Sequence, residues 1–293
     1  NYGYKKNNIK GEIFGKKFQA SLDDNYKNLS FKILNTGINA NFNFEKSNQK
    51  KSLIGSSKIN VLNNYLKFNF LIINDKIEIS KANLKNKNLS IFFDGLVNVN
   101  PFFEVYSNIR INKIDEKLID KLSLEKILEN KEILKKFNSN NKVSYSNKKK
   151  WRNSLIDSHY SEFNLSYGSL AILSQTSIPG GEIDCKGNSL LIEEYPRLSF
   201  NCFFNIKNQK KFLNNFIVSK KLSKDSFNLN LQGSLNLLNK KINFNKINID
   251  NKYIAKEEDV VFFKETFERI LFNESFFNIF NMDKIKEFLN EAI

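Results

Sequence analysis

Two stretches of the sequence, LSIFFDGLVNV over 89–99 and FNLNLQGSLNLL over 227–238, place an apolar residue or a glycine at every second position. Because successive side chains of a β-strand point to opposite faces, this spacing predicts strands with one apolar and one wet face. Both runs are about twice the usual strand length. Long antiparallel strands of this kind must cover the apolar face with another sheet, with helices or with a ligand.

Further runs of the same kind predict that most of the chain is strand. The first 111 residues alternate at 38–44, 66–72 and 77–79, and strands are expected again at 162–173, 182–193 and 197–206. In-phase glycines predict bends or bulges where a long sheet curves. These glycines are Gly11, Gly55, Gly95 and Gly233. A slip of the alternation between Phe244 and Ile247 predicts one more bulge.

Helical spacing of apolar residues appears in three other places. It predicts two short helices over 114–137, a short helix over 208–218 and a helical tail over 257–293. The tail carries an aromatic-rich stripe over 260–289, which suits either a cap on the sheet or contact with a membrane surface or another protein.

The expected fold is therefore mainly β with α. We expect a long, curled antiparallel sheet, or β-groove, with short helices at 114–137 and a helical C-terminal tail. Four segments follow from the composition: an N-terminal β-groove segment over 1–137, a polar linker over 138–150, a second β segment over 151–256, and the tail over 257–293.

The charge of the chain leaves two interpretations open. Lys and Arg total 46 against 31 Asp and Glu, which gives a net charge of +15. The lysines are scattered, and Lys, Asn, Ile and Phe all have A/T-rich codons, so genome composition can account for the excess. The alternative is a dedicated anion-binding face. Arg occurs only at Arg110, Arg152, Arg197 and Arg269, which disfavours nucleic acid as a partner.

The sequence offers no catalytic constellation. A nucleophilic triad would have to pass through the single histidine, His159, which we expect at the surface or in a turn. The acid pairs at 23–24, 193–194 and 257–258 are typical of turns or helix starts. Cys185 and Cys202 are expected to be small buried hydrophobes, and a bond between them is left open. We expect no enzyme, no metal site and no cofactor.

The stretch KWRNSLIDSHYSEFNLSYGSLAI over 150–172 resembles the C-terminal region of AsmA-like envelope proteins. Trp151, then Leu155-Ile156-Asp157, then an alternating strand stand in the order found in that family, which usually has Pro where this chain has Leu155. The resemblance implies long curled sheets with an apolar groove. It also implies a periplasmic protein anchored in the inner membrane through an N-terminal segment absent from this chain, and it brings no catalytic residues.

We therefore expect an envelope protein whose apolar β-groove shields lipid acyl chains, in phospholipid transport toward the outer membrane. The expected partners are phospholipid or another lipid, bacterial membranes, and an envelope protein bound through 257–293. The alternative is a scaffold that supports outer-membrane protein assembly without lipid transport. The expected groove residues are Leu89, Ile91, Phe93, Val97 and Val99, together with Phe227, Leu229, Leu231, Leu235 and Leu237.

Overall fold

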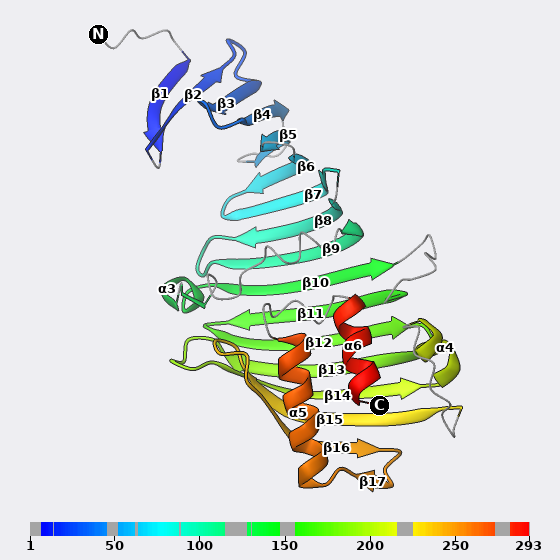
Figure 1. Ribbon diagram of the computed structural model, residues 1–293. Coiled ribbons are helices and arrows are strands. Elements are labelled where there is room, and N and C mark those ends of the chain that lie inside the picture. Colours follow the sequence, from blue (N-terminus) through cyan, green and yellow to red (C-terminus); the bar gives the residue numbers. More distant parts are fainter. Residues whose placement is uncertain are drawn as a thin grey trace. The chain divides into compact units, whose positions relative to one another are not determined.

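The computed structural model of the protein divides into two compact units, Asn1–Ile114 and Asp115–Ile293 (Figure 1). It describes residues 7–13, 15–45, 52–61, 64–87, 89–114, 128–129, 131–146, 156–215, 225–272 and 282–292. The division after Ile114 assigns residues 115–137 to the second unit, whereas we expected them to belong to the N-terminal segment.

The described part of unit 1 contains strands and no helix. Each strand pairs in antiparallel fashion with the next along the chain. The strands are β1 (Asn8–Ile13), β2 (Lys16–Leu22), β3 (Asn28–Ile33), β4 (Ile38–Glu45), β5 (Ser52–Val61), β6 (Asn64–Ile73), β7 (Lys76–Lys85), β8 (Leu89–Asn98) and β9 (Glu104–Ile114).

Unit 2 combines a second antiparallel meander with helices. Its strands are β10 (Asn138–Ser146), β11 (Ser158–Ser166), β12 (Ser169–Ile178), β13 (Gly181–Leu190), β14 (Arg197–Ile206), β15 (Phe227–Asn236), β16 (Ile242–Ile249) and β17 (Tyr253–Ile254). Its helices are α3 (Lys131–Leu134), α4 (Gln209–Asn215), α5 (Glu257–Leu271) and α6 (Met282–Ala292). Sequential strands pair here as well. The predicted class, a mainly β antiparallel fold with a helical C-terminal end, is confirmed.

The polar linker predicted over 138–150 is wrong for its first nine residues, which form β10. NSNNKVSYS has no apolar alternation that would mark a strand, yet it pairs with β11 from Ser139↔Leu165 to Ser146↔Ser158. The strand exists because a neighbouring strand satisfies its backbone groups. Residues 147–150 lie outside the described residues.

The single strand predicted over 162–173 is also wrong, because it is a hairpin of β11 and β12. Tyr167 and Gly168 form its turn with φ of 48° and 85°. Positive φ at both positions belongs to the two-residue turn whose twist matches paired strands. Tyr at the first position gives no Asn-Gly or Asp-Gly signal, so the alternating residues on either side looked continuous.

The glycine predictions succeed at two places and fail at two. Gly95 and Gly233 lie beside register shifts, one in β7 after Ile79 and one in β16 after Phe244. The second shift is the bulge predicted from the slipped alternation. Gly11 and Gly55 mark no shift. At both, an added Cβ would lie under 3.0 Å from the ring of a cross-strand phenylalanine, so the glycine makes room for that ring.

The helix predictions are confirmed at 208–218 and in the tail, whereas over 114–137 Ile114 ends β9 and the described helix is the four-residue α3. α4 covers 209–215 of the predicted 208–218, and α5 and α6 form the tail. Of the two helices predicted over 114–137, residues 115–127 lie outside the described residues, while α3 and the buried Leu128 and Leu134 pack against the core of unit 2. At the start of α5, Asp259 Oδ2 accepts the Lys256 backbone N–H at 3.2 Å, which is the reciprocal half of a capping box, while the Lys256 side chain makes no cap bond.

Candidate lipid-binding face

Alternation in unit 1 gathers its apolar side chains on one face of the sheet. Cross-strand pairs such as Phe31↔Ala40, Ile72↔Ile77 and Phe93↔Ile109 join this face from strand to strand. We call it the unit 1 apolar face. It is formed by Phe18, Ala20, Leu22, Leu29, Phe31, Ile33, Ile38, Ala40, Phe42, Phe44, Leu53, Ile59, Leu66, Phe68, Phe70, Ile72, Ile77, Ile79, Ala82, Leu84, Leu89, Ile91, Phe93, Val97, Val105, Ile109 and Ile111.

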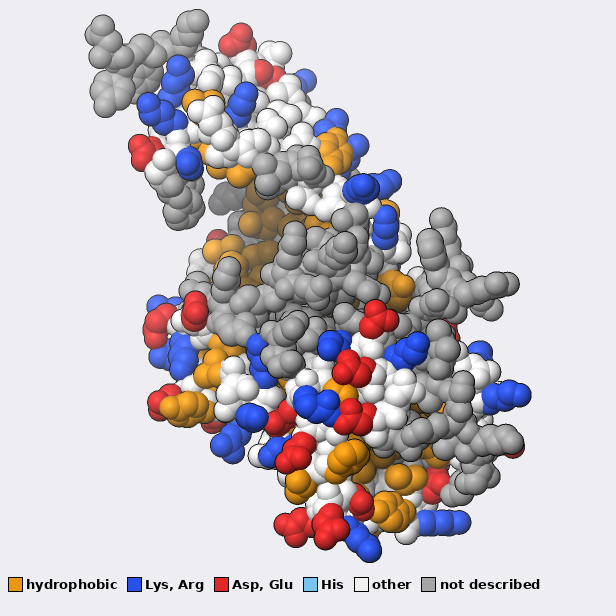
Figure 2. All heavy atoms as spheres, in the orientation of Figure 1, with side chains coloured by type: hydrophobic (Ala, Val, Ile, Leu, Met, Phe, Trp, Pro, Cys, Tyr) orange, Lys and Arg blue, Asp and Glu red, His pale blue; other side chains and the backbone are white. Residues whose placement is uncertain are grey.

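Most large side chains of this face keep part of their surface accessible. Among the described hydrophobic residues of the unit, those that are buried are Ala40, Phe70 and Ala82. Phe42, Phe68 and Phe93 are half-buried, and Leu53 is 41% exposed. No described residue of unit 1 belongs to a helix that could cover them. In Figure 2, apolar side chains are visible in a hollow over β6 to β8.

Aromatic rings stabilise the middle of the face from within. Phe70 lies with its ring centroid 6.4 Å from that of Phe42, 6.0 Å from that of Phe44 and 6.3 Å from that of Phe68. Edge and tilted contacts of this kind each add about 0.5–1.5 kcal/mol beyond area burial. Contacts between neighbouring side chains on the sheet thus stabilise the face. No layer of described residues of the unit covers its outer surface.

The first predicted groove row lies on this face. Leu89, Ile91, Phe93 and Val97 point to one side of β8, opposite Ile111, Ile109 and Val105 of β9, and all four are half-buried. Val99 does not belong to the row, because β8 ends at Asn98 and Val99, the next residue, is 48% exposed. The groove residues expected in this unit come from β8 and the residue that follows it. The alternating runs of β4 and β6 were the signal that the same face continues there.

The second predicted row is the floor of a filled core. Leu231, Leu235 and Leu237 are 8%, 5% and 4% exposed. They belong to one cluster with residues of α5 and with Phe244 of β16. Phe227 and Leu229 are half-buried. The expectation of an open groove at β15 is therefore wrong at these three leucines, because helices of the same chain occupy the space above them.

The aromatic stripe of the tail provides that cover. The Phe244 ring lies 5.1 Å from the Phe263 ring and 5.8 Å from the Phe267 ring, and Phe288 of α6 lies 5.3 and 5.5 Å from the same two rings. α5 and α6 cross the strands of unit 2 on this side (Figure 1). Residues 273–281 of the predicted stripe lie outside the described residues. The described part of the stripe, in α5 and α6, packs inward, and the large apolar residues that α5 exposes are Val261 and Phe262, at 46% and 51%.

A buried carboxylate fixes α5 to the sheet edge. Glu268 Oε1 accepts the backbone N–H of Ile242 at 2.9 Å, and its Oε2 lies 2.9 Å from Lys241 Nζ. The Glu268 side chain is 14% exposed. This pairing satisfies a backbone donor of β16 and orients the helix that covers the apolar face.

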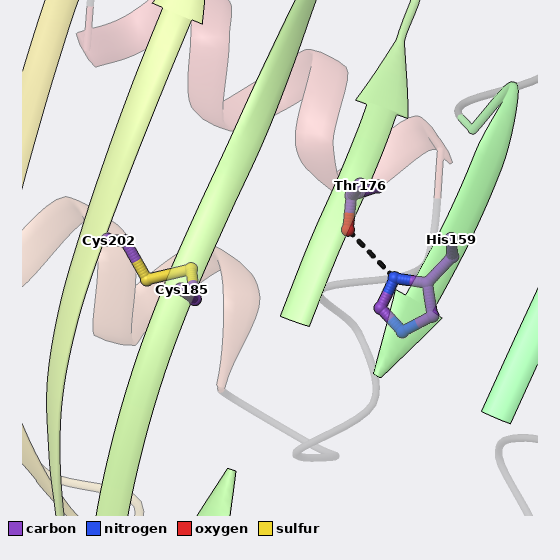
Figure 3. The surroundings of a disulfide bond; sticks show 4 residues. All are labelled: His159, Thr176, Cys185 and Cys202. Atoms are coloured by element: carbon purple, nitrogen blue, oxygen red, sulfur yellow. Dashed lines mark hydrogen bonds between the residues drawn. A yellow bond between two sulfur atoms is a disulfide. The ribbon is translucent and has the colours of Figure 1, made fainter. Parts of the chain in front are cut away.

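The two cysteines form a cross-strand disulfide under the helices of unit 2 (Figure 3). Cys185 and Cys202 are directly opposed in β13 and β14, with Cα atoms 4.1 Å apart. The interpretation of two separate buried thiols is therefore wrong. It failed because it did not anticipate the register of the two strands. β14 begins at Arg197, and its pairing with β13 places Cys202 directly opposite Cys185.

His159 lies in β11 on the same side of the sheet as the disulfide (Figure 3). Its Nδ1 is 2.8 Å from Thr176 Oγ1 of β12, and burial lowers the pKa of the imidazole. The side chain is half-buried, so the expectation of a surface or turn histidine is wrong. Ser161, one in-phase step along β11, is 1% exposed.

The acid pairs have the structural roles that the sequence predicts. Asp23 accepts the backbone N–H of Asn28 at 3.0 Å and its side-chain amide at 2.7 Å, and these two bonds, with a weaker contribution from the Lys27 backbone N–H at 2.6 Å, lower the pKa of its carboxyl. Glu257 opens α5. Within the described ranges, no group of three His, Cys, Asp or Glu side chains could hold a metal ion.

Among the described residues, no helix is both long and apolar enough to cross a bilayer. No protein-family model, curated protein or solved structure matches the chain. Trp151 and Leu155, which carry part of the resemblance to AsmA-like proteins, lie outside the described residues, while Ile156 and Asp157 lead directly into β11.

Proposed function

We propose that this chain is part of an AsmA-like envelope protein, and that its unit 1 apolar face shields lipid acyl chains during phospholipid transport toward the outer membrane. The observation that carries the proposal is the combination of a continuous apolar face on β2 to β9 with half-buried side chains and no covering helix among the described residues. The face supplies apolar surface without a competing polar network.

The chemistry of the face suits a ligand that slides. Burial of an acyl chain gains about 0.8 kcal/mol per CH₂ and has no preferred direction. In-phase residues repeat from strand to strand at about 4.8 Å. Equivalent positions therefore follow one another across the sheet, so that a hydrocarbon chain meets a series of similar sites instead of one tight site.

Two further observations support the location in the proposal. The Cys185–Cys202 disulfide suits an oxidising compartment such as the periplasm. The resemblance at 150–172 points to a periplasmic protein of the inner membrane. The described residues of the 260–289 stripe, in α5 and α6, pack inward and so give no support to the alternative scaffold, which would need that stripe for an envelope partner.

The proposal is tested by measuring phospholipid bound to the purified chain by mass spectrometry. We expect the natural chain to carry phospholipid and Phe93→Asp to carry at least about fivefold less, because a charge on the apolar face disfavours acyl chains. Leu96→Asp is the matched control, since Leu96 lies three residues along β8 on the opposite face and is also half-buried. It should keep its lipid.

Thermal melts of both variants separate lost binding from lost folding. A natural chain that is free of lipid after purification from a bacterial host would overturn the proposal. The same holds if Leu96→Asp loses as much lipid as Phe93→Asp while both variants melt like the natural chain, because the loss would then not depend on the apolar face.

A further inference from the structure

The positive charge of the chain is concentrated in unit 1. Residues 1–114 hold 18 Lys and Arg against 8 Asp and Glu, so this shorter unit carries 10 of the 15 net positive charges. Figure 2 shows more Lys and Arg than Asp and Glu on the visible side of this unit. A codon bias that acts on the whole gene does not by itself place the excess in one part of the fold.

Strand register arranges many of these cations in two adjacent rows on the face opposite the unit 1 apolar face. From β5 to β9, one row reads Asn60, Tyr65, Lys85, Ser90 and Lys113, and the next reads Lys58, Lys67, Asn83, Phe92 and Arg110. Neither row contains Asp or Glu. The carboxylates that share this face, such as Glu78 and Asp94, lie on other rows.

We call Lys58, Lys67, Lys85, Arg110 and Lys113 the basic patch. All five side chains are exposed. Lys58 and Lys67 are directly opposed on β5 and β6, where like charges destabilise a sheet. Among the described residues, the ion pair that involves a residue of the basic patch is Arg110 with Asp94 at 3.9 Å, and the Lys67 ammonium lies 5.0 Å from the Tyr65 ring centroid. An external anion would relieve the repulsion between the lysines.

Unit 2 provides an internal comparison. Its polar face carries Lys142, Lys186, Arg197 and Lys246, but it also carries Glu162, Glu182 and Asp184. Some of these charges are paired: Lys142 Nζ lies 3.5 Å from Glu162, and Lys207 Nζ lies 3.2 Å from Glu182. The same strand pattern thus balances its charges in one unit and leaves them unbalanced in the other.

We infer that the basic patch binds the surface of a bilayer that contains anionic phospholipid. Four of its five cations are lysines, which act as hydrated point charges suited to a diffuse layer of headgroups, whereas nucleic-acid sites favour Arg for bidentate contacts. Strands twist relative to one another, so the contact is confined to the five neighbouring strands β5 to β9, about 19 Å across. This inference does not depend on lipid being held by the apolar face.

The test is co-sedimentation of the full chain with vesicles. Phosphatidylcholine vesicles with about one-third phosphatidylglycerol should bind the chain, and pure phosphatidylcholine vesicles should bind it far less, with binding falling as salt rises. Lys58→Gln/Lys67→Gln/Lys85→Gln should weaken partition by about 100-fold, because each lysine near such a surface contributes about fivefold. The matched control, Lys186→Gln/Lys246→Gln/Lys252→Gln, removes the same charge from exposed positions of unit 2 and should change partition by less than about threefold.

Three results would overturn the inference. An equal loss in both triple variants would assign binding to net charge alone. Absence of binding to the anionic vesicles would remove the patch as a membrane site. Unchanged vesicle binding by the patch variant, with loss of binding to a single-stranded oligonucleotide, would assign the patch to nucleic acid. Because the substituted side chains are exposed, thermal melts should show no loss of stability, and lipid carried by the apolar face is measured separately.

Discussion

Phe93 in β8 and Leu231 in β15 occupy the same kind of position, an in-phase apolar site of a ten-residue strand with a bulge in its neighbour. Leu231 is 8% exposed in a cluster that includes residues of α5, whereas Phe93 is half-buried and no described helix of its unit covers it. The alternation is alike in the two strands. What differs is the helical layer that unit 2 supplies from its own C-terminal end.

This difference shows what a strand pattern leaves undetermined. An apolar strand face predicts that a further layer must cover it, but the residues of that layer lie elsewhere in the sequence. For β15 they lie some 30 residues downstream, in α5. The rings of Phe263 and Phe267 fill the space above Phe244. Unit 1 has no described counterpart of these rings, and for this reason it is the unit to which we assign the lipid.

The largest effect is expected from a buried charge in unit 2. Leu231→Asp should destabilise unit 2 by about 4 kcal/mol or more, because the carboxylate would lie in a packed core without a partner. Phe93→Asp should cost less than about 2 kcal/mol, since part of its side chain already meets solvent. Urea unfolding of both variants measures this contrast. Equal losses would show that the unit 1 apolar face is as filled as that of unit 2.

The next largest effect tests the cover itself. Phe267→Ala should cost about 3–4 kcal/mol, because its ring contacts Phe244, Phe263 and Phe288 and the cavity left behind cannot close fully. Phe262→Ala, at the exposed side of the same helix, should cost less than about 0.5 kcal/mol. Chemical denaturation of the pair gives the difference. Similar values would mean that α5 is only loosely held on the sheet.

The sequence predicted much of this architecture because alternation is a direct consequence of strand geometry. The long strand at β8, the bulge in β16 and the helical tail all carried their own local signals. β10 did not, because its stability comes from pairing with β11 and not from an apolar side. Three further features have no local sequence signal: the disulfide, the filling of the β15 row and the basic patch. Each depends on which residues stand opposite one another or on a distant layer, and one strand alone does not carry that information.

Reduction of the disulfide should lower the stability of unit 2 relative to that of unit 1, by an amount between those of the preceding and the following predictions. The Cys185–Cys202 bond spans 17 residues, and closing a loop of that size stabilises by roughly 3 kcal/mol in the chain-entropy view. Because both cysteines lie in unit 2, reduction should lower the melting temperature of that unit and leave unit 1 unchanged. Differential scanning calorimetry with and without dithiothreitol measures this effect, and Cys185→Ser/Cys202→Ser is the control. A shift of both units together would show that they unfold as one.

The smallest expected effect comes from His159. Burial lowers the pKa of its imidazole below the ordinary value of 6.5, so between the folded and unfolded pKa values the unfolded chain binds the proton more readily than the folded chain. The stabilisation of unit 2 is therefore complete above about pH 6.5 and is lost as the pH falls through the folded pKa. Since the ring is only half-buried and hydrogen-bonded to Thr176, the loss should stay below about 1 kcal/mol. Urea titrations between pH 7.5 and pH 5 should show this decline in the natural chain and a flatter profile in His159→Gln. If the stability of His159→Gln fell with pH as steeply as that of the natural chain, the pH dependence of unit 2 would come from other groups and not from His159.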